Sequence, residues 1–221
     1  MRFPGFRLVL LFGIAAPFLA ACAKSTVRPA FSDPGFSLDS LRSGSSGLVV
    51  SGSVRVTGFE KSFSALFGTG DSLASWLSAR ILDSLNRARP PVPTYAMPAG
   101  MIPFPGEEPA PAPRVPVPRP AVPSYVIRVR DIKVEKALKE VPSAMLPTGG
   151  RGVMVPAGGG TSQSCVVTLD VEIWETATMI MRHSFSVTGR SEVALYAYKS
   201  ALRNAALAAA RRTAARLKGE P

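Results

Sequence analysis

The sequence predicts a single α+β domain, a two-layer sandwich of about four mostly antiparallel strands with two helices on one face of the sheet. Four segments alternate apolar and polar residues, which is typical of strands that bury one face. Two further segments repeat apolar residues every three or four positions, which is typical of helices with one buried stripe. In chain order they run strand, helix, strand, strand, strand, helix. We expect the domain to span 47–218, with insertions at 90–123 and 141–163.

The first strand is expected at 48–57 and the first helix at 71–88. One phase of the strand is apolar: Leu48, Val50, Val54 and Val56. The helix carries its apolar stripe at Leu73, Trp76, Leu77, Ile81, Leu85 and Ala88. Thr69 or Asp71 can cap the N-terminus of this helix, and Pro90-Pro91 ends it.

The insertion at 90–123 holds 13 of the 21 prolines in the chain. Such a composition favours extended polyproline II over regular hydrogen-bonded structure. A surface insertion that the domain tolerates is the simpler interpretation, because loop-closure entropy grows only slowly with length. A docking strip or semi-rigid spacer is the alternative.

The second strand, at 125–136, changes phase part-way along. Ile127 and Val129 share one phase, whereas Ile132 and Val134 share the other. A β-bulge near Arg130-Asp131 would return both pairs to one face. The insertion that follows, at 141–163, is rich in glycine and proline, but no Gly-Lys-Ser/Thr follows its glycines, so a phosphate-binding loop is excluded.

The last two strands and the last helix are expected at 165–174, 179–188 and 192–217. The two strands alternate cleanly and are joined by a short link near Thr176-Ala177, which indicates an antiparallel hairpin. The helix is rich in alanine, which allows close approach to a sheet. Its C-terminal half is rich in arginine, which suits the helix dipole.

The N-terminus has the layout of an export signal. Arg2 and Arg7 precede an apolar run from Leu8 to Leu19, which is too short to cross a bilayer comfortably. The run ends in Leu19-Ala20-Ala21-Cys22.

These four residues resemble the lipobox of a bacterial lipoprotein precursor. The resemblance implies a signal peptide at 1–21, cleavage after Ala21, and acyl chains such as palmitate on Cys22, which together hold a protein on a membrane. No Asp follows Cys22, so by the same resemblance the periplasmic leaflet of the outer membrane is favoured, with the inner membrane as the alternative. An ordinary secreted protein or an uncleaved anchor would be the alternative interpretation of the signal. We expect residues 22–46, rich in Ser, Pro, Gly and Asp, to form a flexible tether.

The combination of lipobox, short tether, α+β domain and Ala/Arg-rich last helix resembles the small envelope lipoproteins of Gram-negative bacteria. This group includes lipopolysaccharide-assembly lipoproteins, auxiliary lipoproteins of envelope ABC transporters and activator lipoproteins of penicillin-binding proteins. The resemblance is architectural and implies an accessory role in the envelope. No motif beyond the lipobox carries it, so it transfers no functional residue.

The chain offers little for catalysis or metal binding. Its one histidine, His183, falls on the apolar phase of a strand, as does Cys165, so both are expected in the core. Asp170 and Glu172 share a polar strand face, where solvation explains them more simply than acid–base catalysis. We therefore expect no catalytic residue, no metal site and no cofactor.

The candidate binding residues are basic or aromatic. The precursor carries a net charge of +11, which suits anionic lipid, lipopolysaccharide or cell-wall polymer better than nucleic acid in an exported protein. Trp174 lies on a polar face, either as a binding surface or covered by an insertion. The basic candidates are Arg128, Arg130 and Lys133, which could join Arg211 and Arg212 if the last helix packs nearby; ordinary solvated ion pairs are the simpler interpretation.

The functional expectation is a periplasm-facing, membrane-anchored lipoprotein that acts without catalysis by binding another envelope protein during assembly or transport. Binding of lipid, lipopolysaccharide or cell-wall polymer is the alternative, and an envelope hydrolase is the least favoured.

Overall fold

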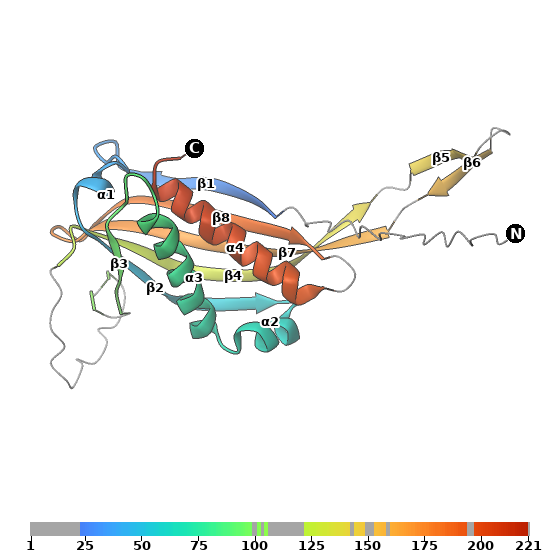
Figure 1. Cartoon of the computed structure of the whole chain (residues 1–221), viewed down its shortest axis with the longest axis horizontal. Coiled ribbons are helices and arrows are strands. Elements are labelled where there is room, and N and C mark those ends of the chain that lie inside the picture. The colour runs from blue at the N-terminus through green and yellow to red at the C-terminus, as the bar shows by residue number, and fades with distance from the viewer. Residues whose placement is uncertain are drawn as a thin grey trace, which may run out of the picture.

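The computed structural model describes residues 23–98, 101–102, 104–105, 122–141, 144–148, 153–157, 160–193 and 197–220. The expected signal peptide and Cys22 lie outside these residues. A six-stranded mixed sheet dominates the fold, with strand order β1-β8-β7-β4-β2-β3 (Figure 1). Its strands are β1 (Lys24–Ser32), β2 (Ser46–Thr57), β3 (Thr94–Ala96), β4 (Tyr125–Val141), β7 (Gly160–Glu175) and β8 (Ile180–Glu192). A separate antiparallel pair, β5 (Ala144–Thr148) and β6 (Val153–Ala157), connects β4 to β7.

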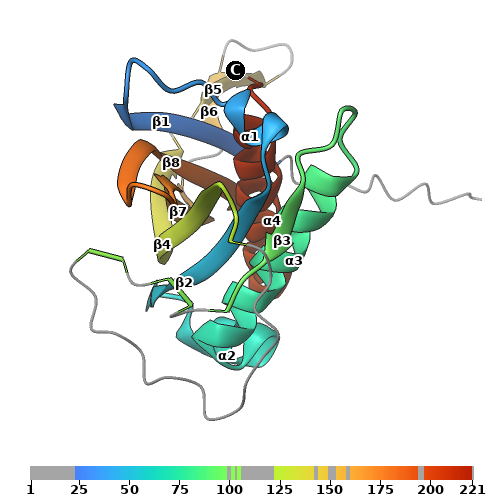
Figure 2. The same ribbon diagram turned by 90° about the vertical axis from the view of Figure 1, so that its left-hand side faces the viewer.

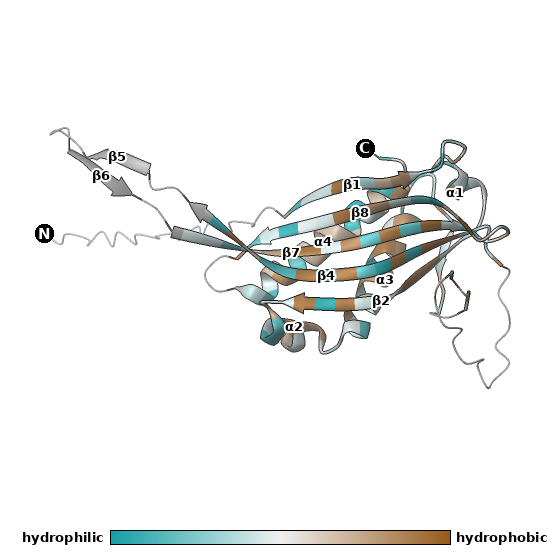
Figure 3. Cartoon of the chain, turned by 180° about the vertical axis from the view of Figure 1, so that it is seen from behind, coloured by the Kyte–Doolittle hydropathy of each residue, from teal (hydrophilic) through white to brown (hydrophobic). Residues whose placement is uncertain are grey.

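The helices α2, α3 and α4 lie on one face of this sheet (Figure 2). The described helices are α1 (Ser40–Ser43), α2 (Glu60–Phe67), α3 (Gly70–Asn86) and α4 (Tyr198–Leu217). The main core fills the space between sheet and helices, where the apolar phase of each central strand meets the stripes of α3 and α4. Among the described residues no helix covers the other face of the sheet, seen in Figure 3, where the strands alternate hydrophilic and hydrophobic residues.

The predicted α+β class is broadly consistent with the structure, but the predicted four-stranded sheet is wrong. The sheet has six strands, and β2 pairs in parallel with both β3 and β4. The parallel pairing follows from the long connection between β2 and β4, which runs through α2 and α3 before returning to the sheet. The missed strands β1 and β3 carry no usable apolar alternation, because both lie at edges of the sheet and β3 has three residues.

The expected tether at 22–46 is also wrong, because most of it belongs to the folded domain. Strand β1 pairs antiparallel with β8 from Lys24 to Ser32, and the loop after it leads into α1. The side chains of β1 are mostly exposed, so the strand is held to the sheet by its backbone hydrogen bonds and needs no apolar residues. Arg182 joins this loop to the β7–β8 turn, with ion pairs of 2.6 Å to Asp33 and 2.7 Å to Glu175.

The bulge expected in the second strand is confirmed. The pairing of β4 with β7 shifts register between Val129 and Asp131. As a result, the four apolar residues on either side all enter the main core: Ile127, Val129, Ile132 and Val134. The side chains of Arg128 and Lys133 consequently lie on the open face.

The α3 helix and the β7–β8 hairpin are confirmed with small changes of boundary. Thr69 caps α3 by accepting a hydrogen bond from the Ser72 amide at 3.3 Å. The last helix starts later than expected, at Tyr198, because β8 continues to Glu192.

Helix α4 approaches β8 at Gly189. A Cβ atom at this position would lie 2.1 Å from the Ala205 carbonyl oxygen and 2.6 Å from the Ala209 amide nitrogen. Alanines on the helix and glycine on the strand therefore let the two backbones come into direct contact.

Candidate functional site

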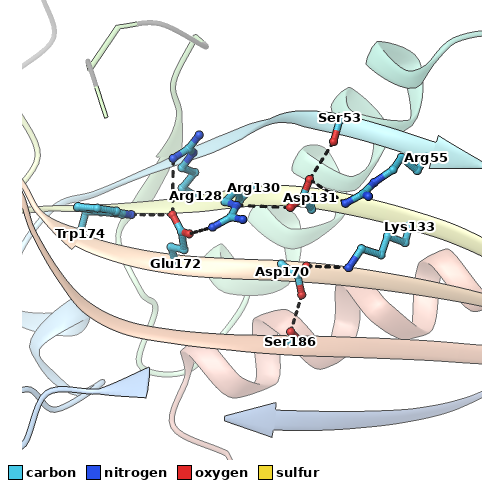
Figure 4. Close-up of polar contacts among 10 residues, drawn as sticks. All are labelled: Ser53, Arg55, Arg128, Arg130, Asp131, Lys133, Asp170, Glu172, Trp174 and Ser186. Carbon is cyan, nitrogen blue, oxygen red and sulfur yellow. Dashed lines mark hydrogen bonds and ion pairs between the residues drawn. The ribbon is translucent and has the colours of Figure 1, made fainter. Parts of the chain in front are cut away.

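A compact group of charged and aromatic side chains lies on the open face, near the start of β4 and the end of β7 (Figure 4). We call it the Arg128 cluster and define it as Phe104, Arg128, Arg130, Glu172 and Trp174. Beside it, a small second core forms on the same face from Val49, Met97, Phe104 and Val126. The segment after β3 supplies Met97 and Phe104, so part of the expected insertion at 90–123 covers this end of the sheet.

Arg128 is the buried centre of the cluster. Only 7% of the residue is exposed. Its guanidinium carbon lies 4.3 Å from the centre of the Phe104 ring, a cation–π contact, and one of its nitrogens lies 3.6 Å from a Glu172 carboxylate oxygen. Burial lowers the pKa of Arg128 from its usual value, while the Glu172 charge opposes that shift. The residue is thus held between an aromatic ring and a carboxylate.

Glu172 connects the remaining members. It accepts hydrogen bonds from Trp174 Nε1 at 3.0 Å and from Arg130 at 3.2 Å. That hydrogen bond to Glu172 is the main reason that the pKa of Arg130 is raised. The Arg130 side chain remains 58% exposed, so it presents charge to solvent from a fixed position.

Trp174 is half-buried, and a residue of the 90–123 segment covers it. Its ring meets Phe104 edge-on, with 5.8 Å between ring centres. A residue of the insertion thus covers part of the Trp174 ring, and its role in binding stays a prediction. The residue is still partly exposed, and Glu172 lies between it and Arg130 (Figure 4).

Two further groups of ion pairs continue along the open face. Asp131 accepts a hydrogen bond from Ser53 at 2.8 Å and lies 3.7 Å from Arg55. The pKa of Asp131 is lowered, mainly by the hydrogen bond from Ser53 and further by the nearby Arg130 charge. Lys133 lies 3.5 Å from Asp170, which also accepts a hydrogen bond from Ser186.

This arrangement suits binding better than acid–base chemistry. Each described carboxylate of the open-face groups, namely Asp131, Asp170 and Glu172, already contacts a cation and a further hydrogen-bond donor. Exposed arginine beside a fixed aromatic ring is the composition found at the energetic centres of protein interfaces. Arg130 and Lys133 form ion pairs as expected, but the Glu172 side chain that pairs with Arg130 is only 12% exposed, so the expectation of a solvated Glu172 is wrong.

The structure does not bring Arg211 and Arg212 to this cluster. Helix α4 packs on the core face of β7 and β8, whereas Arg128 alternates with core residues and lies on the opposite face. The sheet therefore separates the two groups of basic residues. Arg211 is exposed on α4 and Arg212 is half-buried there.

Phe104 is the member of the cluster that sequence reasoning missed. It lies among prolines with no periodic pattern, so neither helix nor strand spacing singles it out. Gly47 in the sequence is a weak indication that another segment approaches β2 closely. A Cβ there would lie 1.9 Å from the Met97 sulfur, so the glycine makes room for the segment that carries Phe104.

The core placement of Cys165 and His183 is confirmed. Cys165 is fully buried, and burial raises the pKa of its thiol to about 12, which makes it an inert core residue at neutral pH. His183 is 3% exposed. Within the described ranges, no group of three or more His, Cys, Asp or Glu residues is placed to hold a metal ion. No helix in this part of the chain is long and apolar enough to cross a membrane.

Comparisons with known proteins found no matching family model and no matching curated sequence. Among solved structures, a PelC dodecamer from Paraburkholderia phytofirmans is similar, with 16% identity over 88% of this chain and 97% of that chain, and a TM-score of 0.38. A putative neuraminyllactose-binding hemagglutinin homologue from Helicobacter pylori shares 12% identity over 80% of this chain and 83% of that chain, with a TM-score of 0.39. At these TM-scores, the similarity assigns neither a family nor a function.

Proposed function

We propose that this chain is a lipid-anchored lipoprotein of the bacterial envelope that acts without catalysis, by binding another envelope protein through the Arg128 cluster. The observation that carries the binding role is the exposed Arg130 side chain, fixed by Glu172 beside the half-buried Trp174. Such a preformed group loses little side-chain entropy when a partner covers it.

The anchor and the cluster lie at different ends of the sheet in this proposal. Strand β1 begins at Lys24, so a lipid on Cys22 would hold this end of the sheet within about 7 Å of the membrane surface. Across the sheet, Lys24 of β1 pairs with Arg190 of β8, Arg190 pairs with Val166 of β7, and Val166 pairs with Glu135 of β4. Arg128 is seven residues nearer the start of β4, a distance of roughly 20 Å along the strand. The cluster would therefore lie roughly 20 Å from the anchored end of the sheet.

Site-directed photo-cross-linking in cells tests the binding role. A photoreactive amino acid replaces Arg55, an exposed residue of β2 that lies beside Asp131 on the open face. The proposal expects a discrete protein adduct from this position. It also expects the adduct to weaken several-fold in an Arg130→Gln background, because Arg130 is a contact of the partner.

The matched control places the same photoreactive residue at Arg203, which is exposed on α4, on the other side of the sheet. Equal adducts from both positions, or an adduct that is indifferent to Arg130→Gln, would contradict the proposed interface. Adducts with lipid or glycan alone would favour the second candidate, a ligand-binding lipoprotein, which the basic composition of the chain supports.

A further inference from the structure

A cavity of about 440 Å³ lies on the helix side of the sheet, where the C-terminal end of α4 meets α1 and the loop after β1. Figure 2 shows α1 and the C-terminus close together at this end of the molecule. The polar residues that line it include Ser32, Ser37, Asp39, His183, Arg216 and Lys218. Its volume is that of a small-molecule site, and it is separate from the Arg128 cluster on the opposite face.

His183 is the first unusual feature of this cavity. Although the residue is 97% buried, neither of its ring nitrogens has a hydrogen-bond partner among the described residues. The ring instead packs against Phe36 and Phe185, with centre-to-centre distances of 6.3 and 5.6 Å. A buried polar group without a partner is costly, which points to an occupant that can form a hydrogen bond with an imidazole.

Arg216 is the second unusual feature. Its Nε is also buried without a hydrogen-bond partner, and no ion pair to it occurs within the described ranges. An Nε–H group can only donate, so whatever completes the site must present an acceptor there. The Arg216 charge also acts on His183, because the lowered pKa of that imidazole is due to burial and, after it, to Arg216.

The charge balance of the lining favours an anion. The one carboxylate that lines the cavity, Asp39, is 3.0 Å from Arg42 and so is already neutralised. Arg216 and Lys218 remain, and Lys218 pairs with Glu220, which is not part of the lining. The C-terminal dipole of α4 opposes an anion by about half a charge, less than the charge that Arg216 supplies.

We propose that this cavity binds a small molecule through an oxyanion group, a phosphate or a carboxylate, that accepts hydrogen bonds from Arg216 and His183. Arginine and oxyanion form strong charge-assisted hydrogen bonds, and a neutral imidazole can donate one as well. The hydroxyls of Ser32 and Ser37 line the same space and offer further donors. This site does not depend on the function proposed for the open face.

The single histidine of the chain makes the test specific, because every imidazole NMR signal of the folded protein comes from His183. The protein, prepared from residue 23 onward, is titrated with inorganic phosphate, glycerol 3-phosphate or acetate at constant pH, with sodium chloride at matched ionic strength as the reference. We expect a saturable shift of the ring ¹⁵N signals with at least one oxyanion. Saturation by the phosphates identifies a phosphate ligand, and saturation by acetate identifies a carboxylate.

The Arg216→Gln variant should weaken this saturation at least tenfold, whereas Arg203→Gln, an exposed arginine on the same helix, should leave it unchanged. Backbone amide spectra of both variants check that the fold is retained. Shifts that sodium chloride reproduces, or saturation that survives Arg216→Gln in a folded protein, would overturn the proposal. The absence of any shift would do the same.

Discussion

Glu172 is the residue on which the Arg128 cluster depends, since it contacts Arg128, Arg130 and Trp174 at once. Removal of one partner from a buried ion pair is costly because the remaining charge is left in a poorly solvated place. The side chains of Arg128 and Glu172 are only 9% and 12% exposed, so this cost applies here.

We expect Glu172→Ala to lower the free energy of unfolding by about 3 kcal/mol, measured by urea denaturation. The control is Asp83→Ala, which breaks the exposed ion pair with Arg87 and should cost at most about 0.5 kcal/mol. Similar losses in the two variants would show that the cluster is an ordinary surface network.

The burial of His183 should make the free energy of unfolding depend on pH. Burial, and after it the Arg216 charge, lower its pKa below the ordinary value of 6.5. The unfolded chain then binds a proton more readily than the folded chain, so this contribution to stability is fully present above pH 6.5 and is lost as the pH falls toward the folded-state pKa. Urea unfolding at pH 7.5 and 5.5 should show a smaller loss in His183→Gln than in the unaltered protein. An equal loss in both would contradict the buried, neutral imidazole.

At the scale of elements, the backbones of α4 and β8 lie in direct contact at Gly189. Gly189 makes this contact possible, because the α4 backbone at Ala205 and Ala209 occupies the space that a side chain at position 189 would need. Overfilling such a contact forces the helix away from the sheet.

Gly189→Ala should therefore destabilise the domain by about 2–3 kcal/mol in thermal or urea unfolding. Gly35→Ala is the matched control, because the nearest atom to its added Cβ would be the Asp33 carboxylate at 3.6 Å, an ordinary contact. If Gly189→Ala were as stable as the control, α4 would not lie where the structure has it.

The elements that could be predicted from the sequence are those with a buried phase. The bulge in β4 followed from two apolar pairs of opposite phase, and α3 from one stripe and a cap. Strand β1 could not be predicted, because backbone hydrogen bonds hold it at an edge and its side chains are exposed. The parallel pairing of β2 and β4 depends on the path of the connection between them, which apolar periodicity does not report.

In the candidate site, too, only the residues that lie in a regular strand pattern could be predicted. Trp174, Arg128 and Arg130 stood out as aromatic or basic residues in a strand pattern. Phe104 reaches them from a proline-rich segment whose sequence contains no period. Arg211 and Arg212 were grouped with them by charge alone, and the sheet lies between.

At the scale of the whole molecule, part of the 90–123 segment belongs to the folded domain. Met97 and Phe104 pack on the open face, whereas 106–121 lie outside the described residues. A Gly-Ser linker of equal length in place of 106–121 should change the free energy of unfolding by less than about 1 kcal/mol, because the connection between the described residues on either side keeps its length. Phe104→Ala should cost about 3 kcal/mol in the same urea assay. A linker variant that is as unstable as Phe104→Ala would show that 106–121 belong to the core.

The central claim is that this domain works from a lipid anchor at Cys22, and the intact mass of the mature protein tests it most directly. The protein is extracted from the membranes of a bacterial host with detergent and measured by mass spectrometry beside a Cys22→Ser variant. We expect a chain that begins at residue 22 and carries the mass of two or three acyl chains, with no acylation in the variant. A mature chain that begins elsewhere, or that carries no lipid, would contradict the anchor and the envelope role built on it.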